Sequence, residues 1–432
     1  MTSDITTLST ETLHQSLTDP SLESMNFLNE IANTYPEAIS FAPGRPFEDF
    51  FSVGLIHDDL ARFEKYLAVD KGYTPEVVRR TFFQYGRTKG IIHDVIAEYL
   101  KVDEGCHVDP ESIVVTTGCQ EAMLLTLRAL RRDDRDVMLA VAPTYVGLTG
   151  AARLVDMPVI PVAGSEGGVD FDDLIATVRR VRAAGQRPRA LYILPDFSNP
   201  SGLTLDLDTR RGLLDLAERE NFLILEDNPY GLFHGGTGRL PTLKSMDEKR
   251  RVVYLGSFAK TVLPGARVGF LVADQAVRDE AGSLGLFADE LAKIKSMVSV
   301  NTSAISQAVV AGRLLQHGYS LVKGNEREVL VYQANLRRLT QGLERHLAPF
   351  DGVHWNVPVG GFFLVVTVPF PADDALVRTS ASDYGVLWTP MRHFYDNPAA
   401  AHQIRLSYSL LRPEEIDEGL ERLASLVRDR MP

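Results

Sequence analysis

The sequence predicts an α/β fold with a mixed, mostly parallel sheet covered by helices, followed by a smaller α+β domain. Between about residues 110 and 275, short runs rich in β-branched residues alternate with longer stretches that place Leu and Ala at helical spacing. This alternation is typical of parallel strands joined by crossover helices. The predicted strands lie in the segments SIVVTTG, DVMLAVAP, RALYILPD, NFLILEDN, RVVYLGS and RVGFLVA.

The connections between these strands indicate how the sheet is built. Segments 120–132 and 206–219 have the Leu and Ala spacing of covering helices. Only about a dozen residues, with Pro264 and Gly265 among them, separate VVYLG from VGFLVA. That connection is too short for an ordinary crossover, so we expect one antiparallel strand there and a mixed sheet.

The chain divides by composition into an arm (residues 1–50), a large domain (51–300) and a small C-terminal domain (301–432). The arm contains ISFAPGRPFEDFF, which has no clear period. Residues 285–347 form a long helical region, and strands are predicted in GGFFLVVTV, GVLWTP and HQIRLSYS. The last segment, RPEEIDEGLERLASLVRDR, is an amphipathic helix with acids first and arginines last, which matches the helix dipole.

Composition favours a small-molecule enzyme of the cytoplasm. The 432 residues carry a formal net charge of -12 with acids spread along the chain, which disfavours nucleic-acid or anionic-membrane partners. Two cysteines and a start, MTSDITTLSTETLHQ, without a basic region or apolar run make secretion and disulfides improbable. Apolar runs such as FFLVVTVPF are too short to span a bilayer. No metal site is expected.

Polar residues stand directly after the predicted strands, where ligands bind in open α/β sheets. They are Gly118, Cys119 and Gln120 after IVVTT, SNPSG after LYILPDF, Asp227 after LILE, and Ser257 and Lys260 after VVYLG.

Together these residues would suit a phosphorylated aldehyde. A helix that begins with Gly118 offers free N–H groups to a phosphate, and Ser257 and Arg267 could add a hydroxyl and a guanidinium. The Lys260 amine in the same crevice suggests a Schiff base with an aldehyde. Asp227 would keep a pyridine nitrogen protonated, so that the ring withdraws electrons. Pyridoxal 5′-phosphate has all of these features.

The chain resembles the fold-type I pyridoxal-phosphate enzymes, in particular the aminotransferases of the kynurenine and 2-aminoadipate subgroup. This family implies a large domain built on a seven-stranded, mostly parallel sheet. The resemblance covers nearly the whole chain. Its motifs are ISFAPGRP, FQYGRTKG, TTGCQEA, APTYVG, PDFSNPSG, EDNPYG, GSFAKTVLPGARVGF, GGFF and IRLSYS.

The resemblance implies a role for each residue around the cofactor ring. Lys260 would form the internal aldimine and later move the proton between the substrate α-carbon and the cofactor. Asp227 would pair with the pyridine nitrogen. Asn199 and Tyr230 would hydrogen-bond the phenolic oxygen of the ring, and Tyr145 would stack on its face.

The resemblance also implies a phosphate site shared by two subunits. The phosphate would lie on the backbone N–H groups of Cys119 and Gln120, with Ser257 and Arg267 beside it. Tyr85 of FQYG would reach in from a second subunit, which predicts a homodimer. Many relatives have a serine where this chain has alanine, directly before the lysine, so one hydroxyl that often holds the phosphate is absent.

Substrate binding is expected to involve arginines. Arg405 would clamp the substrate α-carboxylate as a bidentate fork, with Asn199 beside it, although strand alternation also fits an exposed strand. Arg45 lies in the arm that lines the substrate side in related enzymes. We interpret His354 and His393 as structural or rim residues, because the lysine already serves as the base.

The reaction expected from these motifs is reversible transfer of an amino group between an α-amino acid and an α-keto acid. The alternative is another reaction on the same scaffold, such as γ-elimination, cyclisation or oxidation of an amino acid. A transcriptional regulator is disfavoured, because no helix-turn-helix region precedes these motifs. The segments FAPGRP, GCQEAMLLTLRAL and LEDNPYG are similar to those of transaminases that make dihydroxyphenylglycine for peptide antibiotics, which favours an aromatic, nonproteinogenic substrate.

Overall fold

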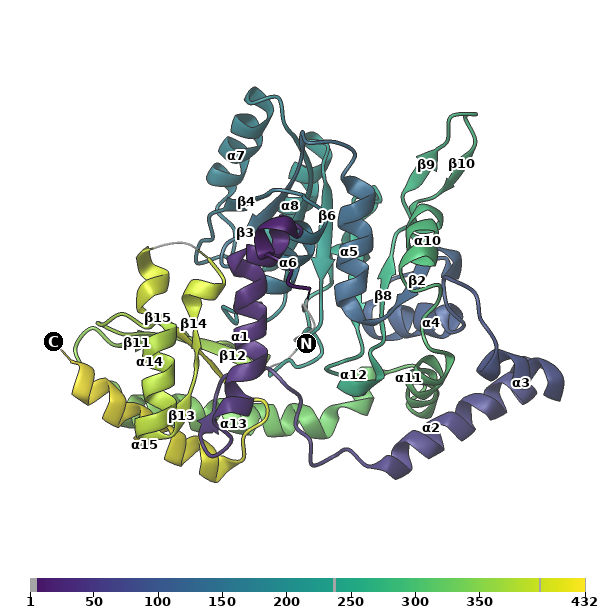
Figure 1. Ribbon diagram of the computed structural model, residues 1–432. Coiled ribbons are helices and arrows are strands. Elements are labelled where there is room, and N and C mark those ends of the chain that lie inside the picture. Colours follow the sequence, from purple (N-terminus) through teal and green to yellow (C-terminus); the bar gives the residue numbers. More distant parts are fainter. Residues whose placement is uncertain (1–5, 236–237, 396–397, 432) are drawn as a thin grey trace, which may run out of the picture.

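The computed structural model describes residues 6–235, 238–395 and 398–431, and a seven-stranded sheet lies at its centre (Figure 1). The strand order is β2-β8-β7-β6-β5-β3-β4. β8 is antiparallel to both of its neighbours and the other pairings are parallel, so the predicted mixed sheet is confirmed. The strands are β2 (Ile113–Thr116), β3 (Asp136–Val141), β4 (Val159–Val162), β5 (Arg187–Ile193), β6 (Leu223–Asp227), β7 (Val252–Ser257) and β8 (Gly269–Val272).

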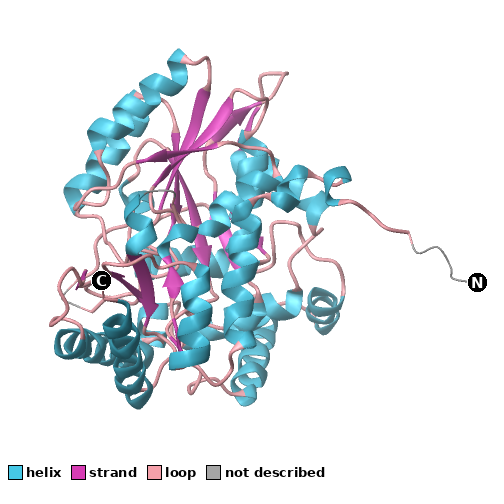
Figure 2. Ribbon diagram, turned by 60° about the vertical axis from the view of Figure 1, so that its left-hand side comes forward, coloured by secondary structure: helices cyan, strands magenta, loops and turns pink. Residues whose placement is uncertain are grey.

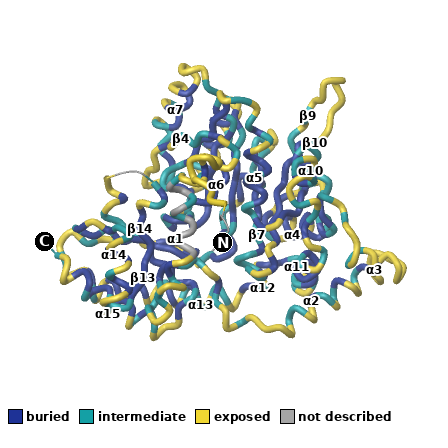
Figure 3. The backbone as a smooth tube through the Cα atoms, in the orientation of Figure 1, coloured by how far each residue is buried: buried dark blue, intermediate teal, exposed yellow. Residues whose placement is uncertain are grey.

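Helices cover both faces of this sheet (Figure 2), and the strands between them are buried (Figure 3). Alternation along β3 explains the arrangement. Met138 packs with residues of α5 and α6, whereas Leu139 packs with residues of α7 and α8 on the other face. The covering helices are α4 (His93–Glu104), α5 (Gly118–Leu130), α6 (Val146–Leu154), α7 (Phe171–Ala183), α8 (Leu207–Arg219), α9 (Leu243–Met246), α10 (Phe287–Val298) and α11 (Ala304–Gln316).

The small domain is a four-stranded antiparallel sheet in the order β11-β12-β15-β14, packed with helices. The region predicted as one long helical stretch is divided into α10, α11, α12 (Leu321–Gly324) and α13 (Glu326–His346). The remaining elements are β11 (His354–Trp355), β12 (Phe363–Thr367), β13 (Val386–Leu387), β14 (Thr389–Pro390), β15 (Gln403–Ser407), α14 (Asp374–Thr379) and α15 (Pro413–Arg430).

The N-terminal region connects the two sheets. α1 (Pro20–Thr34) contacts α6, and β1 (Ile39–Ser40) pairs in parallel with β13 of the small domain. The chain then continues into α2 (Val53–Lys65) and α3 (Pro75–Phe83). A short hairpin of β9 (Ala276–Arg278) and β10 (Leu284–Leu286) extends from the large domain (Figure 1). The boundaries given above for the arm and the two domains stay predictions.

Within the described ranges, no helix is both long and apolar enough to cross a membrane. The same residues include no group of three His, Cys, Asp or Glu side chains arranged to hold a metal ion.

Candidate active site

A buried carboxylate ends β6 at the carboxyl edge of the sheet. Asp227 is 3% exposed, and burial raises its pKa to about 6. The Tyr192 hydroxyl donates to its Oδ2 atom at 2.6 Å, and the Cys119 thiol lies 3.5 Å from Oδ1. Both hydrogen bonds oppose the rise in the pKa, but burial dominates.

A lysine amine lies at the same edge, just after β7. Lys260 Nζ donates to the carbonyl oxygen of Gly44 at 2.5 Å. Burial lowers the pKa of this amine to about 8, and the positive charges of Arg405, Arg267 and Arg45 lower it further. About a tenth of the amine is therefore neutral at pH 7 and about half at pH 8, and a neutral amine is a nucleophile.

The N-terminus of α5 forms a candidate anion site. Gly118 has a φ of +74°, and a Cβ atom there would lie 2.5 Å from Arg267 Nη2, so only glycine fits this conformation and this contact. The guanidinium therefore lies against the first turn of the helix, where N–H groups lack intrahelical partners. The nearby Ser257 hydroxyl accepts a hydrogen bond from the N–H of Ala259 at 3.2 Å.

Three hydrogen bonds hold this helix start in place. Glu121 Oε2 accepts from the N–H of Thr117 at 2.6 Å, and buried Lys295 on α10 donates to the same oxygen at 2.8 Å. Gln120 Nε2 donates to the carbonyl oxygen of Gly147 at 2.6 Å, which ties α5 to α6. The predicted phosphate-binding turn thus belongs to a rigid part of the fold.

A second guanidinium lies opposite, on β15. Arg405 is 5% exposed, which excludes the exposed-strand alternative. It donates to Asn199 Oδ1 at 2.6 Å, to the Ala42 carbonyl at 2.7 Å and to Thr389 Oγ1 at 3.2 Å. Its guanidinium lies 4.3 Å from the ring centroid of Phe363. The buried Nε atom has no hydrogen-bond partner among the described residues, so it can still donate to an acceptor.

Two tyrosines complete the group. Burial raises the pKa of Tyr145 to about 12, and the neighbouring Asp227 carboxylate adds to the rise. Burial also raises the pKa of Tyr230, whereas a hydrogen bond with Asn199 acts in the opposite direction. Both tyrosines are therefore neutral phenols near pH 7, and the structure brings them together with Asp227, Asn199 and Arg405.

Other predicted residues lie farther out. Tyr85 is 85% exposed in the segment after α3, outside the cluster in a single chain. Arg45 is exposed, although it is close enough to lower the pKa of Lys260. The two histidines lie in the small domain: His393 bonds Ser24 and Asp374, and His354 is exposed on β11.

Several contacts of this site were not predicted from the sequence. The role predicted for Cys119 uses its backbone N–H group, and the structure adds a contact between its thiol and Asp227. Tyr192 was not singled out, although a hydroxyl-bearing residue near the carboxyl end of an otherwise apolar strand is a usable signal. The carbonyl groups of Ala42 and Gly44 carry no sequence signal, because every residue has one.

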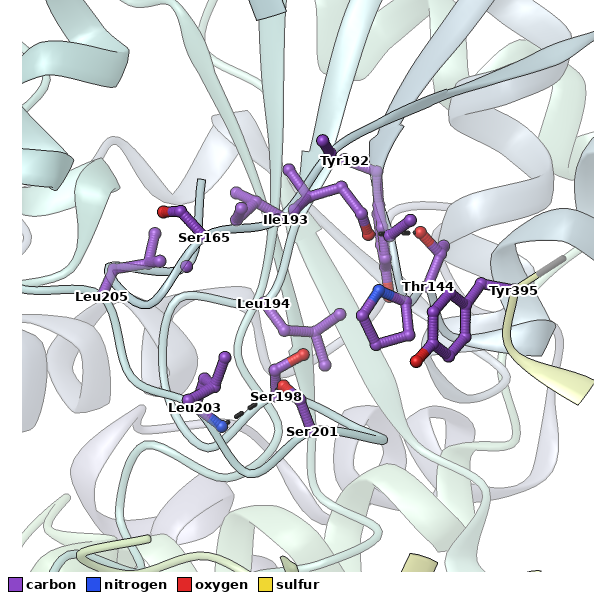
Figure 4. Close-up of a pocket in the computed structure, with 16 residues that line it drawn as sticks. Thr144, Ser165, Tyr192, Ile193, Leu194, Ser198, Ser201, Leu203, Leu205 and Tyr395 are labelled. Carbon is purple, nitrogen blue, oxygen red and sulfur yellow. Dashed lines mark hydrogen bonds between the residues drawn. The ribbon is translucent and has the colours of Figure 1, made fainter. Parts of the chain in front are cut away.

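A side cavity of about 310 Å³ adjoins the cluster (Figure 4). The carboxyl ends of β3 and β5, the loop 198–205 and Tyr395 of the small domain line it. Tyr192 belongs to its wall, so this residue separates the cavity from Asp227. The lining is uncharged and carries several hydroxyl groups.

Comparison with known sequences places these residues in a wider context. The family model for class I and II aminotransferases matches residues 74–423. The (S)-3,5-dihydroxyphenylglycine transaminase of Amycolatopsis orientalis is 55% identical over 426 residues, 99% of this chain and 96% of that protein. The 2-aminoadipate transaminase of Thermus thermophilus is 30% identical over 398 residues, 91% of either chain.

Solved structures agree with the sequence matches. Kynurenine aminotransferase of Pyrococcus horikoshii, crystallised with pyridoxamine phosphate and kynurenine, superposes with a TM-score of 0.80 at 27% identity and covers 94% of this chain and 95% of its own. The α-aminoadipate aminotransferase of Thermus thermophilus, complexed with phosphopyridoxyl-leucine, gives a TM-score of 0.79 at 28% identity and covers 98% and 99%.

The buried Asp227 carboxylate should destabilise the ligand-free protein. Because the pKa of Asp227 rises from 3.8 to about 6 on folding, the native state binds more protons in this window and stability falls as the pH rises through it. Asp227→Asn should therefore stabilise the ligand-free protein by about 3 kcal/mol at pH 8 and by only about 1 kcal/mol at pH 4.5, where the folded-state carboxyl group is mostly protonated. Urea unfolding at the two pH values measures this difference.

The exposed residue Asp134 provides the control, since Asp134→Asn should change stability at neither pH. Destabilisation by Asp227→Asn at pH 8 would contradict the expectation, because it would mean that the carboxylate is favourably compensated within the chain.

Proposed function

Because the chain belongs to the class I and II aminotransferases and is an enzyme of that family, we propose that it transfers the amino group of an arylglycine to an α-keto acid with pyridoxal 5′-phosphate as its cofactor. The observation that carries the proposal is the combination of a depressed lysine pKa, a buried carboxylate and an anion-binding helix start at one edge of the sheet.

The residues present fit this cofactor. Oδ2 of Asp227 is occupied by Tyr192, whereas Oδ1 has only a long contact with a thiol and can accept from a protonated ring nitrogen. The start of α5 and the Arg267 guanidinium suit a phosphate group. Lys260 provides the amine for the aldehyde, and Asn199 and Tyr230 provide polar groups for the phenolic oxygen.

Bound in this way, pyridoxal 5′-phosphate supplies an aldehyde that accepts the amino group and a ring that withdraws electrons from the substrate α-carbon. Lys260 Nζ in its neutral form would take the proton from the substrate α-carbon and deliver it to the cofactor carbon that receives the amino group. Asp227 would compensate a positive charge on the ring nitrogen, and the buried Tyr145 would help to exclude water from the ring. Arg405 binds and orients the substrate carboxylate.

The proposed substrate class follows from the most similar of the relatives described above. That relative is named for (S)-3,5-dihydroxyphenylglycine, and its 55% identity extends over 99% of this chain. An arylglycine carries its ring directly on the α-carbon, next to the carboxylate. The aromatic rings of Phe363 and Phe394 lie 4.3 and 5.1 Å from the Arg405 guanidinium and give this end of the site an apolar border. A role in peptide-antibiotic biosynthesis and a cytoplasmic location are further parts of the proposal.

The experiment that tests the function begins with the purified enzyme loaded with pyridoxal 5′-phosphate. Borohydride reduction should fix the cofactor on Lys260, as peptide mapping detects, and (S)-3,5-dihydroxyphenylglycine should pass its amino group to an added α-keto acid. Lys260→Ala should abolish both results, because no other amine replaces Nζ, whereas exposed Lys293→Ala should retain both.

Three outcomes would count against the proposal: a label on another lysine, no amino transfer, or keto-acid release that needs no amino acceptor. The last result would instead indicate γ-elimination, cyclisation or oxidation.

The carboxylate anchor gives a separate prediction. Arg405→Lys should raise the KM for amino and keto acids alike and lower kcat, because an ammonium cannot reproduce two parallel donors. The expected loss in kcat/KM is about 2 to 4 kcal/mol, measured by steady-state kinetics. The cofactor spectrum should stay unchanged. Exposed Arg412→Lys serves as the control. Normal kcat/KM in both Arg405→Lys and Arg405→Ala would mean that another residue binds the substrate carboxylate. Arg45 would then be the next candidate.

A homodimer with shared sites is also part of the proposal. Tyr85 and Phe83, two residues apart in the sequence, are 85% and 79% exposed, which suits contact with a second copy. Tyr85→Phe should weaken pyridoxal 5′-phosphate binding about five- to tenfold, because one hydrogen bond to the phosphate is lost. Cofactor titration measures this, and sedimentation should give a dimer. Exposed Tyr73→Phe should bind normally. A catalytically competent monomer would refute the shared site.

A further inference from the structure

We propose that Tyr192 is a positioning residue that holds the Asp227 carboxylate ionised and aimed at the cofactor ring. This inference rests on the proposed function, since it assigns Tyr192 a role toward the group that Asp227 binds. It acts through Asp227 and does not itself touch the reacting atoms.

The geometry of the pair is fixed by the sheet. Tyr192 on β5 is 1% exposed, and its hydroxyl donates to Asp227 Oδ2 at 2.6 Å, a short hydrogen bond of the charge-assisted kind. β5 and β6 are hydrogen-bonded neighbours, with Tyr192 opposite Leu225, two residues before the carboxylate. Both ends of the contact therefore lie on rigid strands, and the bond leaves Oδ1 available to the ring nitrogen.

The other groups around Asp227 are weaker donors or lie farther away. The titratable side chains that face it are Cys119 at the start of α5, Tyr145 before α6 and Tyr230 after β6. A thiol is a weak donor, and the contact of Cys119 is 3.5 Å long. Burial raises the pKa of the neighbouring Cys119, and the positive charge of Arg267 opposes that rise. No lysine or arginine in the described part of the chain forms an ion pair with Asp227. The phenol of Tyr192 is thus the main group that stabilises the negative charge.

The protonation behaviour supports this role. Burial raises the pKa of Asp227 to about 6, and the hydrogen bond from Tyr192 is the largest influence that lowers it. Removing the hydroxyl should raise the pKa further and leave more of the carboxyl group neutral between pH 6 and 7. A neutral acid does not compensate a protonated ring nitrogen. Burial also raises the pKa of Tyr192 itself, so this residue stays a donor throughout the working range.

The surroundings of Tyr192 allow its hydroxyl group to be removed without a change in the packing of its ring. One side of the residue lines the side cavity (Figure 4), while its hydroxyl contacts Asp227. Tyr192→Phe removes one oxygen atom and keeps the ring. The buried Tyr254 on β7 provides a matched control, because it packs in the cluster on the opposite face of the same sheet.

The test is a titration of the full-length, cofactor-free protein with pyridoxal 5′-phosphate at pH 6 and pH 8, followed by absorbance. If the pKa of Asp227 rises by about one unit, Tyr192→Phe should weaken binding about fivefold at pH 6 and less than about twofold at pH 8. Titrations of the cofactor's own groups are common to both proteins and cancel in the ratio of their dissociation constants. Tyr254→Phe should leave the ratio near one at both pH values.

Two further variants test whether Tyr192 acts through Asp227 and whether it is the stronger of the two donors. In an Asp227→Asn background, which has no carboxylate to ionise, the extra loss at pH 6 should disappear if Tyr192 acts through Asp227. Cys119→Ala should shift binding in the same direction by a smaller factor, which tests the ranking of donors without changing Tyr192.

Equal weakening by Tyr192→Phe at both pH values, or an unchanged pH-dependent loss in the Asp227→Asn background, would overturn the proposal. So would a pH-dependent loss in Tyr254→Phe. Failure of the proposed function is recognised separately, because the unsubstituted protein would then not bind pyridoxal 5′-phosphate or would not transfer amino groups.

Discussion

Asp227 places a carboxylate at the end of a central strand, away from water and without an ion-pair partner in the described chain. Desolvation of a charge is costly, and the hydrogen bonds from Tyr192 and Cys119 offset only part of that cost. A protonated ring nitrogen of the cofactor would supply the missing positive charge. The buried charge thus destabilises the ligand-free state. The same charge would stabilise the complex when the cofactor binds.

The other charged residues of the site are positive. Arg405, Arg267 and Arg45 lie close enough to Lys260 for their positive charges to lower the pKa of the lysine. An excess of positive charge in a chain with a net charge of -12 indicates anionic ligands, such as a phosphate and a substrate carboxylate. The same positive charges add to burial in lowering the pKa of the lysine amine, so anion binding and nucleophile activation depend on one electrostatic arrangement.

Backbone groups of the N-terminal region join the two sheets at this point. The carbonyl of Ala42 accepts from Arg405 and that of Gly44 accepts from Lys260, across more than two hundred residues of sequence in either case. A Cβ atom at Gly44 would lie 2.3 Å from the ring of Phe363, so the close approach requires glycine. Asn199 of the large domain bonds Arg405 of the small domain. The site is therefore formed where the N-terminal region, the large domain and the small domain meet.

The sequence by itself determined the order of strands along the chain, the antiparallel β8 and the polar residues at strand ends, because these depend on local periodicity and on where each strand stops. It missed β4, whose residues Val159–Val162 include a proline and form an edge strand that is only partly buried. Only the tertiary structure decided which side chains meet: the bond between Tyr192 and Asp227, the burial of Arg405 and the closure by Ala42 and Gly44. Such contacts depend on packing between distant segments, and no local pattern encodes them.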